Sequence, residues 1–224
     1  MSSRPPIEGR RPIRDSALHG QLADGAVRQH DGQRVAVVPL EFLSDLRDAV
    51  APDFGPSARH LFYCTGYDWS LRDMVRLGQR LRDELGSGNL DLWQMDAKFV
   101  LDSWWTPLAA AGWGACTFAA LPRGFVLAEV TSSATAAAQR ERATPAPEPA
   151  CDLYAGLLAG ALSFFERAER HAVEIQCAAL GHPTCLFIAG GSPHIEKIET
   201  WRQQNLSAAE IRQRLAALPD APAA

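Results

Sequence analysis

The sequence has no apolar run long enough to span a membrane, and residues 1–14 are polar and basic with no apolar segment behind them. Neither a membrane-spanning protein nor a secretory leader is therefore expected. Positive charge is not in excess, since the formal net charge of the 224 residues is −4 at pH 7. This balance argues against a protein that binds nucleic acid through a basic surface.

Cysteine occurs five times, an odd number without the spacing of a disulfide framework. This usage favours a reducing compartment, so we expect a cytoplasmic protein. The sequence also lacks a Gly-x-Gly-x-x-Gly fingerprint after a strand, a P-loop and a Gly-x-Ser-x-Gly elbow. The best-known nucleotide and serine-hydrolase sites are therefore not indicated. Whether the protein is an enzyme stays open, with a non-enzymatic role favoured.

The hydrophobic fraction of 47% and the charged fraction of 21% are typical of a globular domain. Apolar periodicity predicts helices over residues 40–52, 57–62, 70–85 and 91–111. The stretch from Gly66 to Trp69 separates the second helix from the third. Ser70 and Asp73 resemble a capping box at the start of the third helix. Pro107 is expected to kink or end the fourth.

The second half of the chain is predicted to alternate strands and helices. Residues 113–120 and 125–131 form two strands, and the Ala/Ser/Thr/Pro-rich residues 131–150 form a loop that is not buried. A helix then begins at Cys151, in which two glycines four residues apart permit a close helix contact. Terminal helices follow, the last of them after the capping box Ser207-x-x-Glu210.

Residues 171–186 concentrate the groups that can carry chemistry. Apolar and polar residues alternate up to Cys177, as in a strand, and a second strand resumes at Cys185 after a Gly-His-Pro turn. The hairpin would bring these two cysteines together near its turn. Glu174 lies on the opposite face of a regular strand from Cys177. A metal shared by both would therefore need a bulge or an early strand end.

A zinc site is one interpretation of this hairpin, because Zn²⁺ accepts both thiolate sulfur and carboxylate oxygen. Cys151 would join it from a helix start, where the helix dipole favours the thiolate. The alternative is a plain hairpin with two buried cysteines that pack as small hydrophobes. Spacing alone leaves both interpretations open.

The pattern Glu174-x-x-Cys177-x-x-x-Gly181-x-x-x-Cys185, preceded by Cys151, resembles the signature of the V4R (4-vinyl reductase) domain. This domain occurs in the sensory modules of phenol- and xylene-responsive activators and in a bacteriochlorophyll-biosynthesis protein. The resemblance implies one zinc ion bound by the two cysteines of the hairpin, Glu174 and Cys151. His182 is an alternative to the carboxylate. Three thiolates and a carboxylate close the coordination sphere, so the zinc is expected to be structural.

The resemblance covers residues 57–190 and implies an α/β (α+β) domain. Its antiparallel sheet packs against helices and encloses a pocket for a small hydrophobic or aromatic ligand. We expect a flexible tail over residues 1–30, an N-terminal helical segment over 31–56, and C-terminal helices with a tail over 191–224. The rings expected to line the pocket, about half of which should instead be ordinary core, are Trp93, Phe99, Trp104, Trp105 and Trp113.

The expected function is that of a stand-alone sensory or carrier domain, homodimeric through its N-terminal helices and acting through a separate protein partner. One alternative is a tetrapyrrole (bacteriochlorophyll) biosynthesis protein of the 4-vinyl reductase type. Another is a scaffold that resembles subunits of a vesicle-tethering complex. The strand over residues 125–131 has no tryptophan, and no histidine occurs between His60 and His171. Phenol recognition in the manner of the phenol sensors is therefore not expected.

Overall fold

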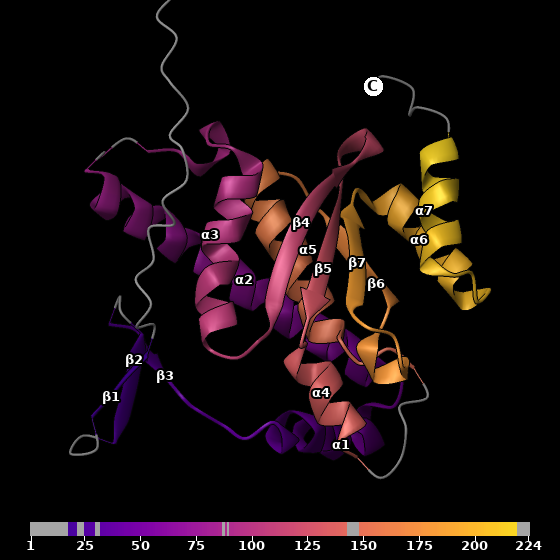
Figure 1. Ribbon diagram of the computed structural model, residues 1–224, viewed down its shortest axis with the longest axis horizontal. Helices are drawn as coiled ribbons and strands as arrows, with labels where there is room; N and C mark the ends of the chain where they lie inside the picture. The colour runs from indigo at the N-terminus through magenta and orange to yellow at the C-terminus, as the bar shows by residue number, and fades with distance from the viewer. Residues whose placement is uncertain are drawn as a thin grey trace, which may run out of the picture.

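The computed structural model describes residues 18–21, 25–29, 32–86, 88, 90–142 and 148–218 (Figure 1). Within these residues, an antiparallel sheet lies between two groups of helices, and a smaller sheet precedes them along the chain. In spatial order, the main sheet consists of β4 (Ala115–Leu121), β5 (Phe125–Thr131), β7 (Cys185–Gly190) and β6 (His171–Gln176). The predicted α+β class, an antiparallel sheet packed with helices, is confirmed.

Seven α-helices are present in the described part of the chain: α1 (Glu41–Phe54), α2 (Ser57–Leu85), α3 (Ala97–Ala110), α4 (Ala134–Arg140), α5 (Asp152–Glu166), α6 (Ser192–Gln203) and α7 (Ala208–Ala217). Short 3₁₀ turns are η1 (Leu92–Gln94), η2 (Pro122–Gly124) and η3 (Ala178–Leu180). No described helix is both long enough and apolar enough to be a candidate for crossing a membrane.

Both faces of the main sheet are covered by helices. On β6, Ala172 belongs to the larger core, which also includes residues of α2, α3 and α5. Val173 and Ile175 belong to the smaller core beneath α6 and α7. The capping box of Ser207 and Glu210 is present at the start of α7, as predicted. The strands near the cluster of cysteines are therefore shielded from water on both sides.

Helices α2 and α5 approach each other closely because glycines lie where they cross. A Cβ atom on Gly66 of α2 would lie 2.1 Å from the carbonyl oxygen of Leu153. Gly156 and Gly160 of α5 lie equally close to the backbone of α2, so the predicted close helix contact is confirmed. The predicted break at Gly66 is wrong, because α2 runs without interruption from residue 57 to 85. Ser70 lies inside this helix and does not cap it.

Pro107 lies inside α3, whereas the sequence predicted a kink or helix end there. Proline cannot donate to the carbonyl four residues earlier, which belongs to Ser103. That carbonyl accepts a hydrogen bond from Arg80 Nη2 at 3.2 Å. The helix therefore continues, because a side chain of α2 replaces the missing donor. Pro52 likewise lies within the last turn of α1.

The predicted loop over residues 131–150 contains helix α4, whose Ala134, Ala136 and Ala138 are buried. The prediction that this stretch is not buried is therefore wrong. Ser133 caps the helix by accepting a hydrogen bond from the backbone N–H of Ala136. Its alanines suit a tight contact, because they place a helix against the core without large side chains.

A three-stranded antiparallel sheet precedes α1 and comprises β1 (Leu18–Gln21), β2 (Ala26–Gln29) and β3 (Arg34–Val35). No regular element was predicted before residue 30, so β1 and β2 differ from that expectation. Residues 1–17, 22–24 and 30 of the predicted tail lie outside the described residues.

Candidate metal centre

Cys151 is the N-cap residue of α5 and directly follows Pro149 and Ala150, which precede the helix. Its backbone N–H donates to Glu174 Oε2 at 3.1 Å, and the backbone N–H of Ala150 donates to Cys177 Sγ at 3.4 Å. The first N–H groups of a helix have no intrahelical partner. The helix start therefore directs donors and partial positive charge at the ligands that come from β6.

Glu174 and Cys177 lie on the same side of the hairpin because β6 is irregular at its end. The pairing of β6 with β7 shifts register between Glu174 and Gln176, and the strand ends at Gln176. Cys177 then has extended backbone and precedes the 3₁₀ turn η3. The bulge and early strand end that a metal shared by Glu174 and Cys177 requires are therefore present.

Cys185 is the first residue of β7 and lies opposite Val130 of the neighbouring strand β5. Its sulfur accepts a hydrogen bond from the backbone N–H of Ala178 at 3.3 Å. Gly181 permits the intervening turn, with a φ of 91° that residues with a side chain rarely adopt. This turn returns the chain so that the second cysteine of the hairpin lies beside the first.

Together these elements form a compact donor set. One ligand atom from each of Cys151, Glu174, Cys177 and Cys185 lies within 4.8 Å of every other. The sulfur of Cys151 is 4.0 Å from that of Cys177 and 3.7 Å from that of Cys185. Zn–S bonds of about 2.3 Å at tetrahedral angles place sulfur atoms about 3.8 Å apart. The spacing thus suits a tetrahedral ion without rearrangement.

One oxygen of the cluster has no partner in the described part of the chain. Glu174 Oε1 is buried and makes no hydrogen bond, whereas Oε2 accepts from the backbone of Cys151. Leaving a buried carboxylate oxygen unpaired is unfavourable, so such an atom calls for an explanation. A metal ion bound to Oε1 would supply the missing interaction. The donors present therefore fit a divalent cation that accepts thiolate ligands.

The charge state of the cluster supports the same fit. Burial raises the pKa of the Cys151 thiol and of the Glu174 carboxyl well above their ordinary values. Hydrogen bonds from the thiols of Cys151 and Cys185 lower the pKa of Cys177. Burial away from water thus opposes a negative charge on Cys151 and on Glu174. A divalent cation removes this restriction by stabilising all four as anions.

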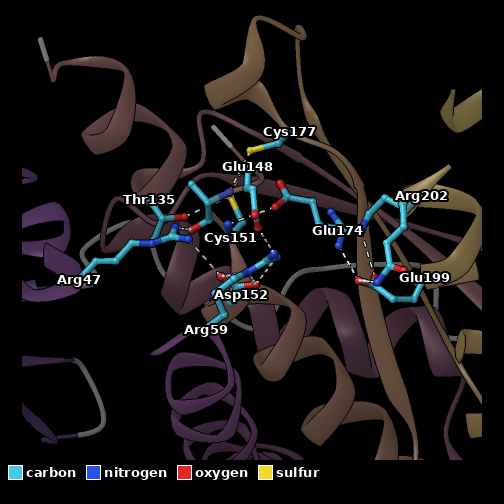
Figure 2. Close-up of polar contacts among 12 residues, drawn as sticks. Arg47, Arg59, Thr135, Glu148, Cys151, Asp152, Glu174, Cys177, Glu199 and Arg202 are labelled. Atoms are coloured by element: carbon cyan, nitrogen blue, oxygen red, sulfur yellow. Dashed lines mark hydrogen bonds and ion pairs between the residues drawn. The ribbon is translucent and has the colours of Figure 1, made fainter. Parts of the chain in front are cut away.

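Hydroxyl groups of α4 complete the surroundings of Cys151. Thr135 Oγ1 donates to its sulfur at 3.2 Å (Figure 2). Ser133 Oγ lies 3.4 Å from the same sulfur. Hydrogen bonds to a metal-bound thiolate orient it and moderate its charge. These two residues were not predicted, because the composition of their segment indicates an exposed loop. The Ser133 capping position was the available signal.

His182, the alternative ligand, is exposed and is not part of the cluster.

Asp152 follows Cys151 and anchors the start of α5. It accepts hydrogen bonds from Arg59 Nη2 at 2.8 Å and from Arg47 Nη2 at 3.4 Å (Figure 2). Arg59 also pairs with Glu148. These contacts join residues about a hundred positions apart, so sequence spacing could not reveal them. They hold the helix start, and with it Cys151, against α1 and α2.

A cleft of about 610 Å³ lies beside the cluster, between α2, β6 and α6, and Glu174 is among its lining residues. Arg59 and Asp152 line it from one side, and Glu199 with Arg202 from the other. Figure 2 shows Glu174 between these two ion pairs. The three cysteines of the cluster are fully buried. Glu174 is therefore the member of the cluster that lies nearest this cleft.

The five rings predicted to line a ligand pocket lie in different environments. Trp104 and Trp105 of α3 are almost fully buried, and Phe99 and Trp113 are partly buried against the same core. Trp93 is 38% exposed and lies outside that core. A role in ligand binding stays a prediction for all five.

Several of these rings meet around Tyr154 of α5. Its ring lies 5.8 Å from that of Trp105, 5.9 Å from that of Trp113 and 6.3 Å from that of Phe187, measured between centroids. Its hydroxyl donates to the carbonyl of Trp113 at 2.6 Å and accepts from the N–H of Ala134 at 3.0 Å. Tyr154 is three residues from Cys151, so this aromatic cluster adjoins the metal centre.

Comparison with known proteins shows that the segment holding the centre resembles one family. Residues 134–191 match the family model of the V4R domain, and this segment contains all four residues of the cluster. The resemblance seen in the sequence is thereby confirmed. No curated protein matches the chain.

The chain is similar to the crystal structure of the phenol-responsive sensory domain of the transcription activator PoxR with phenol. The sequences are 21% identical, the match covers 91% of this chain and 93% of that chain, and the TM-score is 0.60. A second similar structure is trafficking protein particle complex subunit 3 from Naegleria fowleri, covalently bound to palmitic acid. Here the identity is 11%, the coverage 67% and 90%, and the TM-score 0.50.

A vinyl-4-reductase family protein from Methanocaldococcus jannaschii is more distant, at 14% identity, 70% and 83% coverage and a TM-score of 0.42. At identities this low, the first two similarities establish a shared fold and nothing more.

Proposed function

We propose that this chain is a ligand-binding sensory domain of the V4R type, in which one structural zinc ion is held by Cys151, Glu174, Cys177 and Cys185. The observation that carries the proposal is the buried donor set, with sulfur atoms at tetrahedral spacing and an unpaired carboxylate oxygen. The V4R match over the same residues supports it.

A structural role follows from the composition of the centre. Three thiolates and one carboxylate occupy all four positions of a tetrahedral ion, whereas catalytic zinc keeps a position for water. The ion would tie the start of α5 to both ends of the β6–β7 turn. It would thereby stabilise the hairpin that carries Glu174, Cys177 and Cys185.

Elemental analysis tests the metal directly. We expect one zinc per chain in protein purified without chelator, because the four donors are already arranged for it. Mass spectrometry under native conditions should show the same mass increment. Protein that is folded and contains no metal would contradict the proposal, and iron in place of zinc would correct the identity of the ion.

The proposed ligand is a small hydrophobic or aromatic molecule. The shared fold with a phenol-responsive sensory domain supports this class. The close packing of rings around Tyr154 favours a single-ring ligand over a large flat one. A cytoplasmic sensor of this kind would act through a protein partner.

A homodimer formed through the N-terminal helices is part of the same proposal. Its support is an exposed apolar surface on α1 and on the residue before it. The side chains that form this surface are Leu40, Phe42, Leu46 and Phe54.

Ligand-observed NMR with phenol, benzoate and toluene tests the sensory function, with intrinsic fluorescence as a second measurement. We expect saturable binding of at least one single-ring compound, competed by the others. A porphyrin serves as the contrasting probe. Saturable quenching by the porphyrin, with no response to the single-ring compounds, would favour the tetrapyrrole alternative.

A further inference from the structure

A cavity of about 150 Å³ lies between α1, α2, α4 and the start of α5. The apolar and aromatic side chains that line it are Leu43, Leu46, Phe62, Trp69 and Leu153. At Ser44, Thr65 and Thr135 the first three of these helices contribute short side chains to the lining, and these leave space that larger residues would fill. An apolar cavity of about this volume admits one benzene ring. The cavity therefore suits a single-ring ligand and is too small for a tetrapyrrole.

The hydroxyl groups of the lining are already engaged within the protein. Ser44 Oγ and Thr65 Oγ1 each donate to a carbonyl of their own helix, both at 2.8 Å. Thr135 Oγ1 donates to Cys151 Sγ at 3.2 Å. Half-buried Gln139 also lines the cavity, and its side-chain amide has no hydrogen bond to another described residue. An ordered water in such a cavity needs about two to four polar partners, so the lining favours an apolar occupant over water.

The charges of the lining are balanced. Its charged residues are Arg47 and Asp152, which pair with each other at 3.4 Å (Figure 2). Arg47 also donates to the carbonyl of Ala150 at 3.0 Å. Arg59, the second partner of Asp152, is paired in turn with Glu148. Two arginines thus stand against two carboxylates, and an ionic ligand would lose its hydration without gaining an unpaired partner among these residues.

Two of the lining residues connect the cavity to the rest of the site. Trp69 packs edge-on against Trp113, with ring centroids 5.2 Å apart, and Trp113 belongs to the aromatic cluster around Tyr154. Thr135 lines the cavity and donates to Cys151. A ligand in the cavity would therefore contact a residue that orients one of the proposed metal ligands.

We propose that this cavity is the ligand site of the sensory domain and that it binds an uncharged single-ring aromatic molecule. The ring would pack against Phe62 and Trp69, with Leu43 of α1 on the opposite wall. The location rests on the geometry of the cavity, and the sensory role of the site rests on the proposed function. Because α1 forms one wall, binding would stabilise the packing of α1 on the domain.

The test uses toluene as the probe and the intact chain, with ¹³C-labelled leucine methyl groups. In the wild type, bound toluene should show NOEs to the methyl groups of Leu43, Leu46 and Leu153. Leu43→Trp places a larger side chain in the cavity, and it should weaken toluene binding roughly tenfold or more. Ala49→Trp is the matched control, because it adds the same side chain at an exposed position of α1 outside the lining. Its affinity for toluene should equal that of the wild type. Benzoate should bind the wild type roughly tenfold more weakly than toluene, since its carboxylate would lose hydration.

The possible outcomes separate the site from the function. Toluene that binds Leu43→Trp as tightly as the wild type would overturn the site and leave the sensory function standing. NOEs to the core around Tyr154, in place of those to Leu43, would do the same, and this measurement decides if Leu43→Trp does not fold. Benzoate that binds as tightly as toluene would overturn the preference for an uncharged ring. Toluene affinity that falls as the protein is concentrated would assign the cavity to a second copy of the chain and overturn the site. Failure of the wild type to bind any single-ring compound would overturn both the site and the function.

Discussion

Replacement of Cys177 by serine is expected to abolish binding of the proposed zinc ion and to lower the melting temperature by roughly 10–20 °C. Serine offers a hard hydroxyl that stays protonated at neutral pH, so the ion would lose one of its three thiolates. The remaining donors, Cys151, Cys185 and Glu174, would then be buried acidic groups without a cation. Zinc content by elemental analysis and thermal unfolding by circular dichroism measure the two effects.

Two other cysteines of the chain provide matched controls. Cys64 of α2 is exposed and Cys116 of β4 is partly buried, and neither belongs to the cluster. Cys64→Ser should retain one zinc and the wild-type melting temperature. Cys116→Ser should also retain zinc, with at most a small loss of stability from burying a hydroxyl. A Cys177→Ser protein that keeps a full equivalent of zinc would show that the ion is bound elsewhere.

The residues of the candidate centre could be predicted because their chemistry is local in sequence. Glu174, Cys177 and Cys185 lie within one hairpin, and Cys151 is recognisable at a helix start. Periodicity also showed the difficulty that Glu174 and Cys177 face opposite sides of a regular strand. A bulge in β6 resolves that difficulty. The bulge arises from the pairing of β6 with β7, and the sequence of β6 alone does not determine that pairing.

The wrong predictions share a physical cause, which is that a distant segment satisfied a locally unfavourable group. Gly66 normally weakens a helix, but α5 packs against it so closely that only glycine fits. Pro107 removes a helical donor, and Arg80 from another helix replaces it. The Ala/Ser/Thr/Pro-rich composition of residues 131–150 predicts a loop, but the alanines of α4 are buried against parts of the chain that lie far away in the sequence.

The aromatic residues illustrate a further limit. Helical spacing separates Trp104 from Phe99, but it does not distinguish Trp104 from Trp105, since both are almost fully buried. What distinguishes them is that the indole N–H of Trp105 has an acceptor, whereas that of Trp104 has none among the described residues. The carbonyl of Gly114 lies nine residues after Trp105, on the turn that leads into β4. The indole of Trp104 faces α2 and the N-terminal sheet instead, and that neighbourhood is set by tertiary structure.

The second large effect is expected at the crossing of α2 and α5. Gly66→Ala should destabilise the protein by about 3 kcal/mol or more, which corresponds to a fall in melting temperature of roughly 6–12 °C. The added Cβ would lie 2.1 Å from the carbonyl oxygen of Leu153 and 2.9 Å from the backbone nitrogen of Leu157. These are backbone atoms of α5, so no rotamer change relieves the clash. The helices must separate, and contacts along their interface weaken.

Gly78 on the same helix is the matched control, because a Cβ there meets nothing closer than Leu92 Cδ1 at 3.5 Å. Alanine has the higher helix propensity, so Gly78→Ala should stabilise the protein by about 0.5–1 kcal/mol. The same substitution on one helix is thus expected to change stability in opposite directions, and denaturant unfolding measures both changes. Equal effects at Gly66 and Gly78 would mean that α2 and α5 do not pack as closely as the structure places them. Since α5 carries Cys151, Gly66→Ala should also speed the loss of zinc to a chelator, whereas Gly78→Ala should not.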